Sequence, residues 1–111
     1  MKIPRRHFGE FEHILLYAVL HLQDEDAGAS GPTIRQTIEA RTGRVVSPGA
    51  IYTALDRLEQ RGLVSSELGE PTAERGGKRK RMYRMRAAGA AALRSAESAL
   101  DKMARLARAK H

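Results

Sequence analysis

The 111-residue chain contains neither cysteine nor tryptophan. Without cysteine it can form no disulfide scaffold and no thiolate metal site. Its longest apolar run, residues 14–20, is too short to cross a bilayer. Residues 1–8 lack the apolar core of a signal peptide. We therefore expect a soluble, cytoplasmic protein with no membrane partner.

Patterns that support catalysis or cofactor binding are also missing. The histidines have no metal-binding spacing; they are His7, His13, His21 and His111. The chain has no glycine-rich phosphate loop, and spacing places no nucleophile beside a base. We expect no enzyme, no metal and no cofactor, and we interpret His13 and His21 as helix-surface or interface residues.

The positive charge is concentrated in one segment. The chain has a net charge of +7, and residues 69–86 hold seven basic side chains against two acidic ones. Such a charge suits a nucleic acid, although membranes and acidic proteins attract it as well. An isolated basic run is usually a solvated face, so its position in the chain has to decide its meaning.

A helix with a marked start and stop precedes this basic segment. Ser47 is a good N-cap and Pro48 suits the first helical position, while Gly62 ends the helix. The stripe expected to face the core consists of Ile51, Leu55 and Leu58. Small residues lead the opposite face, which is typical of a recognition helix entering the DNA major groove. The alternative is an ordinary amphipathic helix with a good cap.

Two strand candidates, residues 63–68 and 82–85, flank the basic segment and predict a hairpin. Alternation places Tyr83 and Met85 on one face of the second strand, which we expect to face the core. A basic hairpin directly after a capped helix indicates a winged helix-turn-helix, with the wing lying along phosphates.

Helical periodicity predicts three further helices, over residues 9–23, 32–42 and 87–110. The loop between the first two can hold a short third strand. The last helix carries a narrow apolar seam formed by Leu93, Ala96, Leu100, Met103 and Ala107. This seam packs either on the first helix of its own chain or on a second subunit, and we favour a dimer.

Residues 47–64, followed in order by residues 76–85, resemble the PadR-type transcriptional regulators, in the short form with a reduced C-terminal part. The resemblance covers nearly the whole chain. It implies a homodimeric winged helix that binds pseudo-palindromic operator DNA, usually as a repressor. The DNA contacts that it implies are Ser47, Gly49, Ala50, Tyr52 and Thr53 on the helix and Lys78, Arg79, Lys80 and Arg81 on the wing.

The chain departs from the family pattern at two places. Ser30-Gly31 stands where the family often has an aromatic–glycine pair at the start of the second helix. Arg86 stands where a threonine often caps the last helix, so either this cap is missing or Arg86 contacts DNA instead.

These observations predict a mainly α fold with a small β-hairpin: a winged helix-turn-helix over residues 1–86 and a dimerisation helix over residues 87–111. The expected partners are double-stranded DNA and a second copy of the chain. A basic winged-helix module that binds RNA or a protein is the alternative, but the few aromatic residues are mostly at expected core positions, which disfavours base stacking on RNA. The sequence does not specify an operator, the regulated genes or an effector, and it does not distinguish a repressor from an activator.

Overall fold

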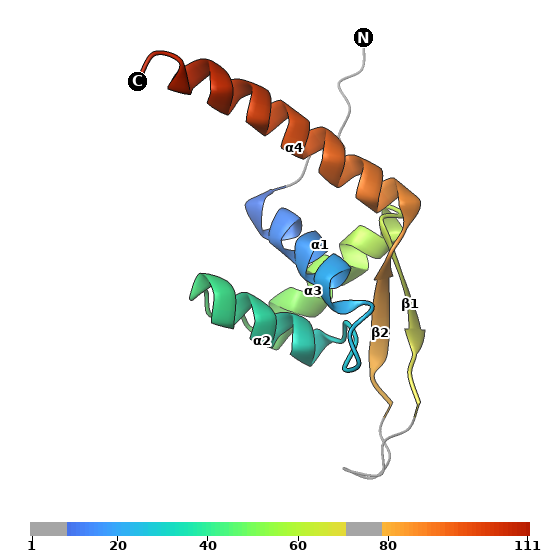
Figure 1. Cartoon of the computed structure of the whole chain (residues 1–111). Helices are drawn as coiled ribbons and strands as arrows, with labels where there is room; N and C mark the ends of the chain where they lie inside the picture. The colour runs from blue at the N-terminus through green and yellow to red at the C-terminus, as the bar shows by residue number, and fades with distance from the viewer. Residues whose placement is uncertain (1–8, 71–78) are drawn as a thin grey trace.

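The computed structural model describes residues 9–70 and 79–111. Within these residues the elements follow the order α1 (Glu10–Leu22), α2 (Gly31–Thr42), α3 (Pro48–Gln60), β1 (Val64–Leu68), β2 (Arg81–Met85) and α4 (Ala87–Arg108). Figure 1 shows α1, α2 and α3 gathered beside the β1–β2 hairpin, with α4 crossing above them. The predicted fold class, mainly α with a β-hairpin, is therefore confirmed.

Local side-chain chemistry sets the helix boundaries. The Ser47 hydroxyl accepts a hydrogen bond from the amide of Ala50 at 3.1 Å, so the predicted N-cap of α3 is present. Gly43 and Gly62 adopt φ angles of +74° and +78° after α2 and α3. Glycine is suited to these left-handed positions because it has no Cβ. The boundaries expected from the sequence agree with the observed ones to within about two residues for this reason.

The core lies where α1, α2 and α3 converge on the inner face of the hairpin. Its fully buried side chains come from every one of these elements and include Leu15, Leu16, Val19, Ile34, Ile38, Ile51, Leu55, Leu58, Val64 and Tyr83. The stripe predicted for α3 is thus buried, as is Tyr83, while Met85 packs partly buried against the same cluster. This core fixes the direction in which the outer face of α3 points.

The hairpin is attached to the start of α2. Strands β1 and β2 pair antiparallel, with Ser66 opposite Tyr83. The amide of Tyr83 also donates to the carbonyl of Ala29 at 2.8 Å, and Ser30 forms an isolated bridge to Met82. The short third strand considered from the sequence is therefore a single bridge, which holds the hairpin beside α2.

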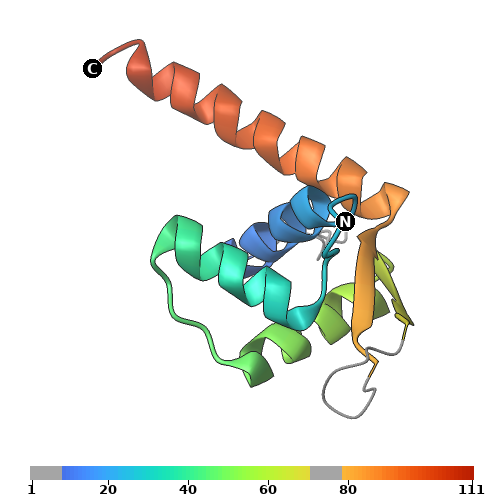
Figure 2. The same cartoon turned by 60° about the horizontal axis from the view of Figure 1, so that its bottom comes forward.

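Helix α4 packs against the rest of the protein at its start and projects away from it at its far end. Near its start, Gly89 lies so close to the carbonyl oxygen of Leu63 that an added Cβ would come within 2.3 Å of it. Leu93 is buried, whereas Leu100 and Met103 are 65% and 63% exposed. Figures 1 and 2 both show the far end of α4 projecting beyond the other helices. In the described part of the chain, no helix is long and apolar enough to cross a membrane.

Candidate nucleic-acid interface

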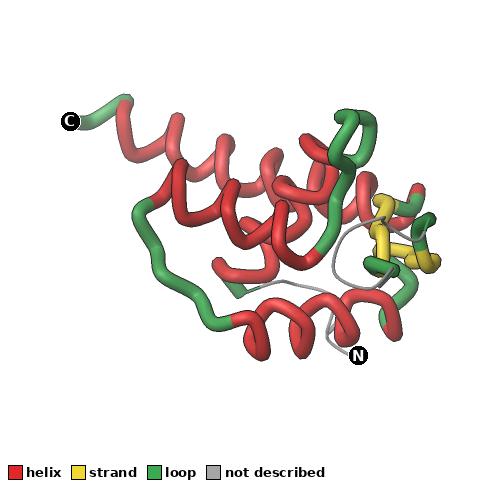
Figure 3. The backbone as a smooth tube through the Cα atoms, turned by 90° about the horizontal axis from the view of Figure 1, so that it is seen from below, coloured by secondary structure: helices red, strands yellow, loops and turns green. Residues whose placement is uncertain are grey.

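The outer face of α3 is a ridge of small, exposed side chains. Gly49, Ala50 and Thr53 are all exposed, on the side of the helix opposite the buried Ile51 and Leu55. Figure 3 shows α3 lying beside α2 and joined to it by the intervening loop, as in a helix-turn-helix. A helix with small side chains at its N-terminal end can approach the base edges of a major groove closely.

Ser47 and Tyr52, also predicted DNA contacts, have structural roles at this ridge. Ser47 caps α3, as described above. Tyr52 is 42% exposed, and its ring lies over the start of α2, where a Cβ on Gly31 would come within 2.3 Å of the Tyr52 hydroxyl oxygen. A side chain at residue 31 would therefore displace the Tyr52 ring, and contact between Tyr52 and α2 helps to hold the two helices of the motif together.

The departure at Ser30-Gly31 retains the glycine of the pair and uses the serine as a cap. Ser30 is buried, and its hydroxyl accepts from the amide of Thr33 at 3.3 Å. The Thr33 hydroxyl accepts in return from the Ser30 amide at 2.9 Å. This reciprocal capping satisfies two amide groups at the start of α2.

Two hollows in the surface flank the α3 ridge. The smaller, of about 90 Å³, lies toward α2 and is lined by Gly31, Pro32, Arg35, Pro48, Ile51 and Tyr52. The larger, of about 320 Å³, lies toward the start of α1 and is lined by Phe11, Gly49, Ala50, Thr53, Ala54 and Arg57. Arg57 is not among the predicted DNA contacts, although its position four residues after Thr53 places both on the same side of the helix.

The basic wing is described only near its base. Lys78 lies outside the described residues, whereas Arg79, Lys80 and Arg81 are exposed. The Arg81 guanidinium donates to the Ser66 hydroxyl at 3.1 Å, which attaches it to the neighbouring strand. Within the described residues Arg79 and Lys80 form no ion pair, so their charges are available to an anionic partner.

Two further arginines, Arg35 and Arg86, differ in what they contribute to the fold. Arg35 donates to the carbonyl of Val46 at 2.8 Å and pairs with Glu39 at 3.2 Å, so it fixes the loop before α3. Arg86 provides no side-chain cap for α4. The threonine cap expected from the family pattern is therefore missing here.

Burial affects the tyrosine on the inner face of the hairpin. Burial raises the pKa of Tyr83, and the nearby carboxylates of Asp56 and Glu59 raise it further. Tyr83 is part of the buried core. The Asp56 flank of α3 faces the hairpin, while Arg57 lies on the flank toward α1.

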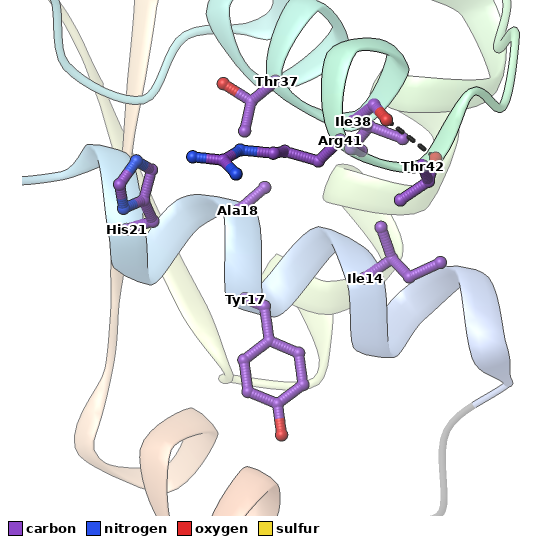
Figure 4. Close-up of a pocket in the computed structure, with 8 residues that line it drawn as sticks. All are labelled: Ile14, Tyr17, Ala18, His21, Thr37, Ile38, Arg41 and Thr42. Carbon is purple, nitrogen blue, oxygen red and sulfur yellow. Dashed lines mark hydrogen bonds between the residues drawn. The ribbon is translucent and has the colours of Figure 1, made fainter.

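A separate hollow of about 340 Å³ lies between α1 and α2 (Figure 4). Its lining residues are Ile14, Tyr17, Ala18, His21, Thr37, Ile38, Arg41 and Thr42. Tyr17 extends away from α2 in Figure 4, and its hydroxyl donates to the carboxylate of Glu97 on α4. His21 and Tyr17 are exposed, which agrees with the surface role expected for His21. No cluster of potential metal ligands occurs among the described residues.

The predicted seam of α4 divides into two parts. Leu93 is buried against the core of its own chain, and Ala96 is half-buried. Leu100, Met103 and Ala107 are exposed in the single chain. Packing on the first helix of the same chain therefore accounts only for the beginning of the seam.

Comparisons with known proteins agree with this architecture. The transcriptional regulator PadR-like family matches residues 15–95. The transcriptional regulator Rv3488 of Mycobacterium tuberculosis is 36% identical over 92 residues, covering 83% of this chain and 79% of that protein.

Solved structures show the same fold. A PadR-like transcription factor from Bacteroides fragilis matches with a TM-score of 0.71 at 18% identity, over 91% of this chain and 89% of that one. Bacillus subtilis PadR, crystallised in complex with operator DNA, matches with a TM-score of 0.62 at 17% identity, over 78% of this chain and 45% of that one. The chain belongs to the PadR-like family of transcriptional regulators.

Proposed function

We propose that the protein is a homodimeric, sequence-specific DNA-binding regulator that acts in the cytoplasm as a repressor at a pseudo-palindromic operator. The observation that carries the proposal is the exposed ridge of Gly49, Ala50 and Thr53 on a capped helix whose other face is fully buried. Small side chains let the helix approach base edges, and the buried stripe holds it rigidly in that orientation.

The wing supplies affinity in this proposal. Arg79 and Lys80 are exposed at the base of a basic hairpin beside α3. Contacts with phosphates fix the register of a protein on the duplex but carry little sequence information. We assign Lys78 to the same role from its place in the sequence. Residues 1–86 then form the DNA-binding part of the chain.

The distal half of α4 supplies the dimer contact. Leu100, Met103 and Leu106 are each more than 60% exposed on one helix, which is an unfavourable arrangement for a single chain in water. Packing against a second copy removes these side chains from water. Residues 87–111 then form the dimerisation helix, and two DNA-binding parts related by a two-fold axis match a pseudo-palindromic site.

Selection of bound fragments from genomic DNA, followed by sequencing, tests the central claim. The fragments should share a pseudo-palindromic sequence, and Thr53→Ala should weaken binding to that sequence by roughly 1–3 kcal/mol, with much less effect on a shuffled duplex. Gln36→Ala, at an exposed position of α2, is the control for substitution at the surface. Recovery of no common sequence would contradict sequence-specific binding.

A duplex RNA of the same sequence separates this proposal from the RNA-binding alternative. Double-stranded RNA has a deep and narrow major groove that side chains cannot read. Binding to DNA should therefore exceed binding to RNA. Bacillus subtilis PadR, which has the same fold, was crystallised with operator DNA, and this supports DNA as the partner.

The wing has its own test. Arg79→Gln should weaken binding to the selected and shuffled sequences by similar factors. The slope of log K against log salt should become shallower by about 0.9 for each phosphate that residue 79 no longer neutralises, or about two for a dimer. Reduced discrimination with an unchanged slope would instead indicate base readout by the wing.

A further inference from the structure

The larger hollow beside α3 shares Gly49, Ala50 and Thr53 with the exposed ridge, but the proposed function assigns no role to its other walls, Phe11 and Arg57. It lies between the first turn of α1 and the flank of α3, with Phe11 on one side and Arg57 on the other. Gly49 opens into this space, because a Cβ added there would meet nothing within 4 Å. The hollow is therefore accessible from the same surface as the exposed ridge.

The dimensions of DNA give this flank a role. An α-helix with its side chains is about 10–12 Å across, and the major groove is about 12 Å wide. A helix that enters the groove consequently meets a sugar-phosphate backbone on each of its two flanks. One strand lies toward α2, beside Gly31 and Tyr52, and the other has to lie toward α1, beside Phe11 and Arg57.

The charges around the larger hollow suit a phosphate. Arg57 is exposed and forms no ion pair within the described residues, whereas Arg35, Arg44 and Arg61 each pair with an acidic side chain. The nearby acidic groups are compensated, since Glu10 pairs with Arg44 at 2.7 Å and Glu12 with Arg61 at 3.4 Å. Arg57 therefore provides a positive charge that the fold does not use.

Apart from Thr53, the remaining wall of the hollow is apolar. Phe11 is half-buried and packs against the core, so its position is fixed by the fold. Ala54 is buried beneath the hollow and Ala50 is exposed at its edge. A deoxyribose ring presents an apolar face next to its charged phosphate, and this combination complements an aromatic wall with an arginine beside it.

We infer that the hollow between Phe11 and Arg57 seats the backbone of the second DNA strand, with the Arg57 guanidinium donating hydrogen bonds to a phosphate and Phe11 packing against the adjoining deoxyribose. This inference rests on the proposed function, because it requires α3 to enter the major groove. It adds Arg57 and Phe11 to the DNA-binding surface as residues that position the recognition helix.

Arg57→Gln, studied in the full-length protein on the selected genomic sequence, tests the inference. Arg94→Gln is the matched control, because it removes the same charge from an exposed position on α4, across the body of the protein from α2 and α3 (Figure 1). Arg57→Gln should make the salt dependence shallower by about 0.9 per contact, or about two for a dimer. Arg94→Gln should leave it unchanged.

Ethylation of individual phosphates provides a second measurement. In the wild type, ethylation of one backbone phosphate in each half-site should block binding through Arg57, and in Arg57→Gln the same ethylation should have little further effect. Equal salt slopes for wild type, Arg57→Gln and Arg94→Gln, with an unchanged ethylation pattern, would overturn the inference.

Failure of the inference is distinguishable from failure of the proposed function. If Arg79→Gln flattens the salt slope while Arg57→Gln does not, the protein binds DNA but the hollow is not a backbone seat. If Arg57→Gln instead weakens self-association, the hollow is a contact with another protein chain, and the inference is wrong. If the wild type selects no DNA, the proposed function fails as well.

Discussion

The two ends of α4 differ sharply in how much apolar side chain they bury. At its start, Gly89 and Leu93 pack against the core, and Leu93 is only 3% exposed. Two turns further on, Leu100 is 65% exposed. The same residue type thus has opposite environments within one continuous helix. The periodicity of an apolar seam indicates which face of a helix packs against a partner. It does not indicate whether a single partner covers the whole length of the helix.

Disrupting the proposed dimer contact in the distal half of α4 should have the largest effect on function. Leu100→Asp places a charge in the proposed dimer contact, where an uncompensated charge costs on the order of 3 kcal/mol. Sedimentation should show the variant as a monomer, and its affinity for the selected operator should fall roughly 100-fold or more because the two half-sites are no longer bound together.

Ser98→Asp is the control for this change. Ser98 is exposed on the opposite side of α4 from Leu100, two residues away. The Ser98→Asp substitution adds the same charge as Leu100→Asp and should leave the dimer intact. Equal dimerisation of the wild type and Leu100→Asp would mean that the exposed part of the seam is not a dimer contact.

Breaking the proximal half should instead destabilise the fold of each subunit. A Cβ at residue 89 would lie 2.3 Å from the carbonyl oxygen of Leu63, which belongs to the backbone and cannot rotate away. Gly89→Ala should therefore cost roughly 1–3 kcal/mol of unfolding free energy, measured by urea denaturation. Ala88→Ser, at an exposed neighbouring position, should have a much smaller effect. An unchanged unfolding free energy in Gly89→Ala would show that α4 shifts easily relative to the core.

A related close approach within the helix-turn-helix should give a smaller and conditional effect. Gly31→Ala should cost about 1 kcal/mol, near the lower end for overpacking, because the Tyr52 side chain can move. The same change made in a Tyr52→Ala background should cost nothing or stabilise the protein, because alanine favours a helix more than glycine does. A double-mutant cycle in urea measures the difference. Additive effects would contradict contact between these residues.

How far the sequence predicts this structure depends on the range of the interactions involved. The start and end of α3 follow from Ser47 and Gly62, since caps act over three or four residues. The inward face of β2 follows from alternation alone. The order of recognition helix and wing follows from the capped helix and the basic hairpin directly after it, and the resemblance to the PadR-type regulators has the same order.

The flanks of α3 could not be predicted in the same way. Phe11 and Arg57 line the same hollow although most of the helix-turn-helix separates them in the sequence. No local sequence pattern indicates that they lie near each other. Tyr52 is a DNA contact that the family resemblance implies, and this stays a prediction. Its contact with Gly31 depends on the crossing of α2 and α3, which tertiary packing determines.

The junction between the hairpin and α4 offers a gain in stability. Arg86 precedes α4 without a side-chain cap, and threonine at an N-cap typically contributes about 1 kcal/mol. Arg86→Thr should therefore raise the unfolding free energy by up to about 1 kcal/mol in urea denaturation. Since Arg86 follows the end of β2 that is distant from the wing turn, the salt dependence of DNA binding should stay the same. A shallower slope would show that Arg86 contacts a phosphate.

The smallest effect is expected where the two halves of α4 meet. Tyr17 on α1 donates to Glu97. Partial burial of the Tyr17 ring is the larger cause and this hydrogen bond the smaller one of a rise in the pKa of Tyr17 from 10.0 to about 12. Because both residues are exposed, Tyr17→Phe should cost only about 0.5 kcal/mol. A pKa raised in the folded state means that the contribution of Tyr17 is complete below pH 10 and is lost as the pH rises toward 12. The difference in unfolding free energy between wild type and Tyr17→Phe should shrink over that interval, measured in urea with both proteins side by side. A difference that stays constant would show that the Tyr17 ring packs on α4 without depending on its proton.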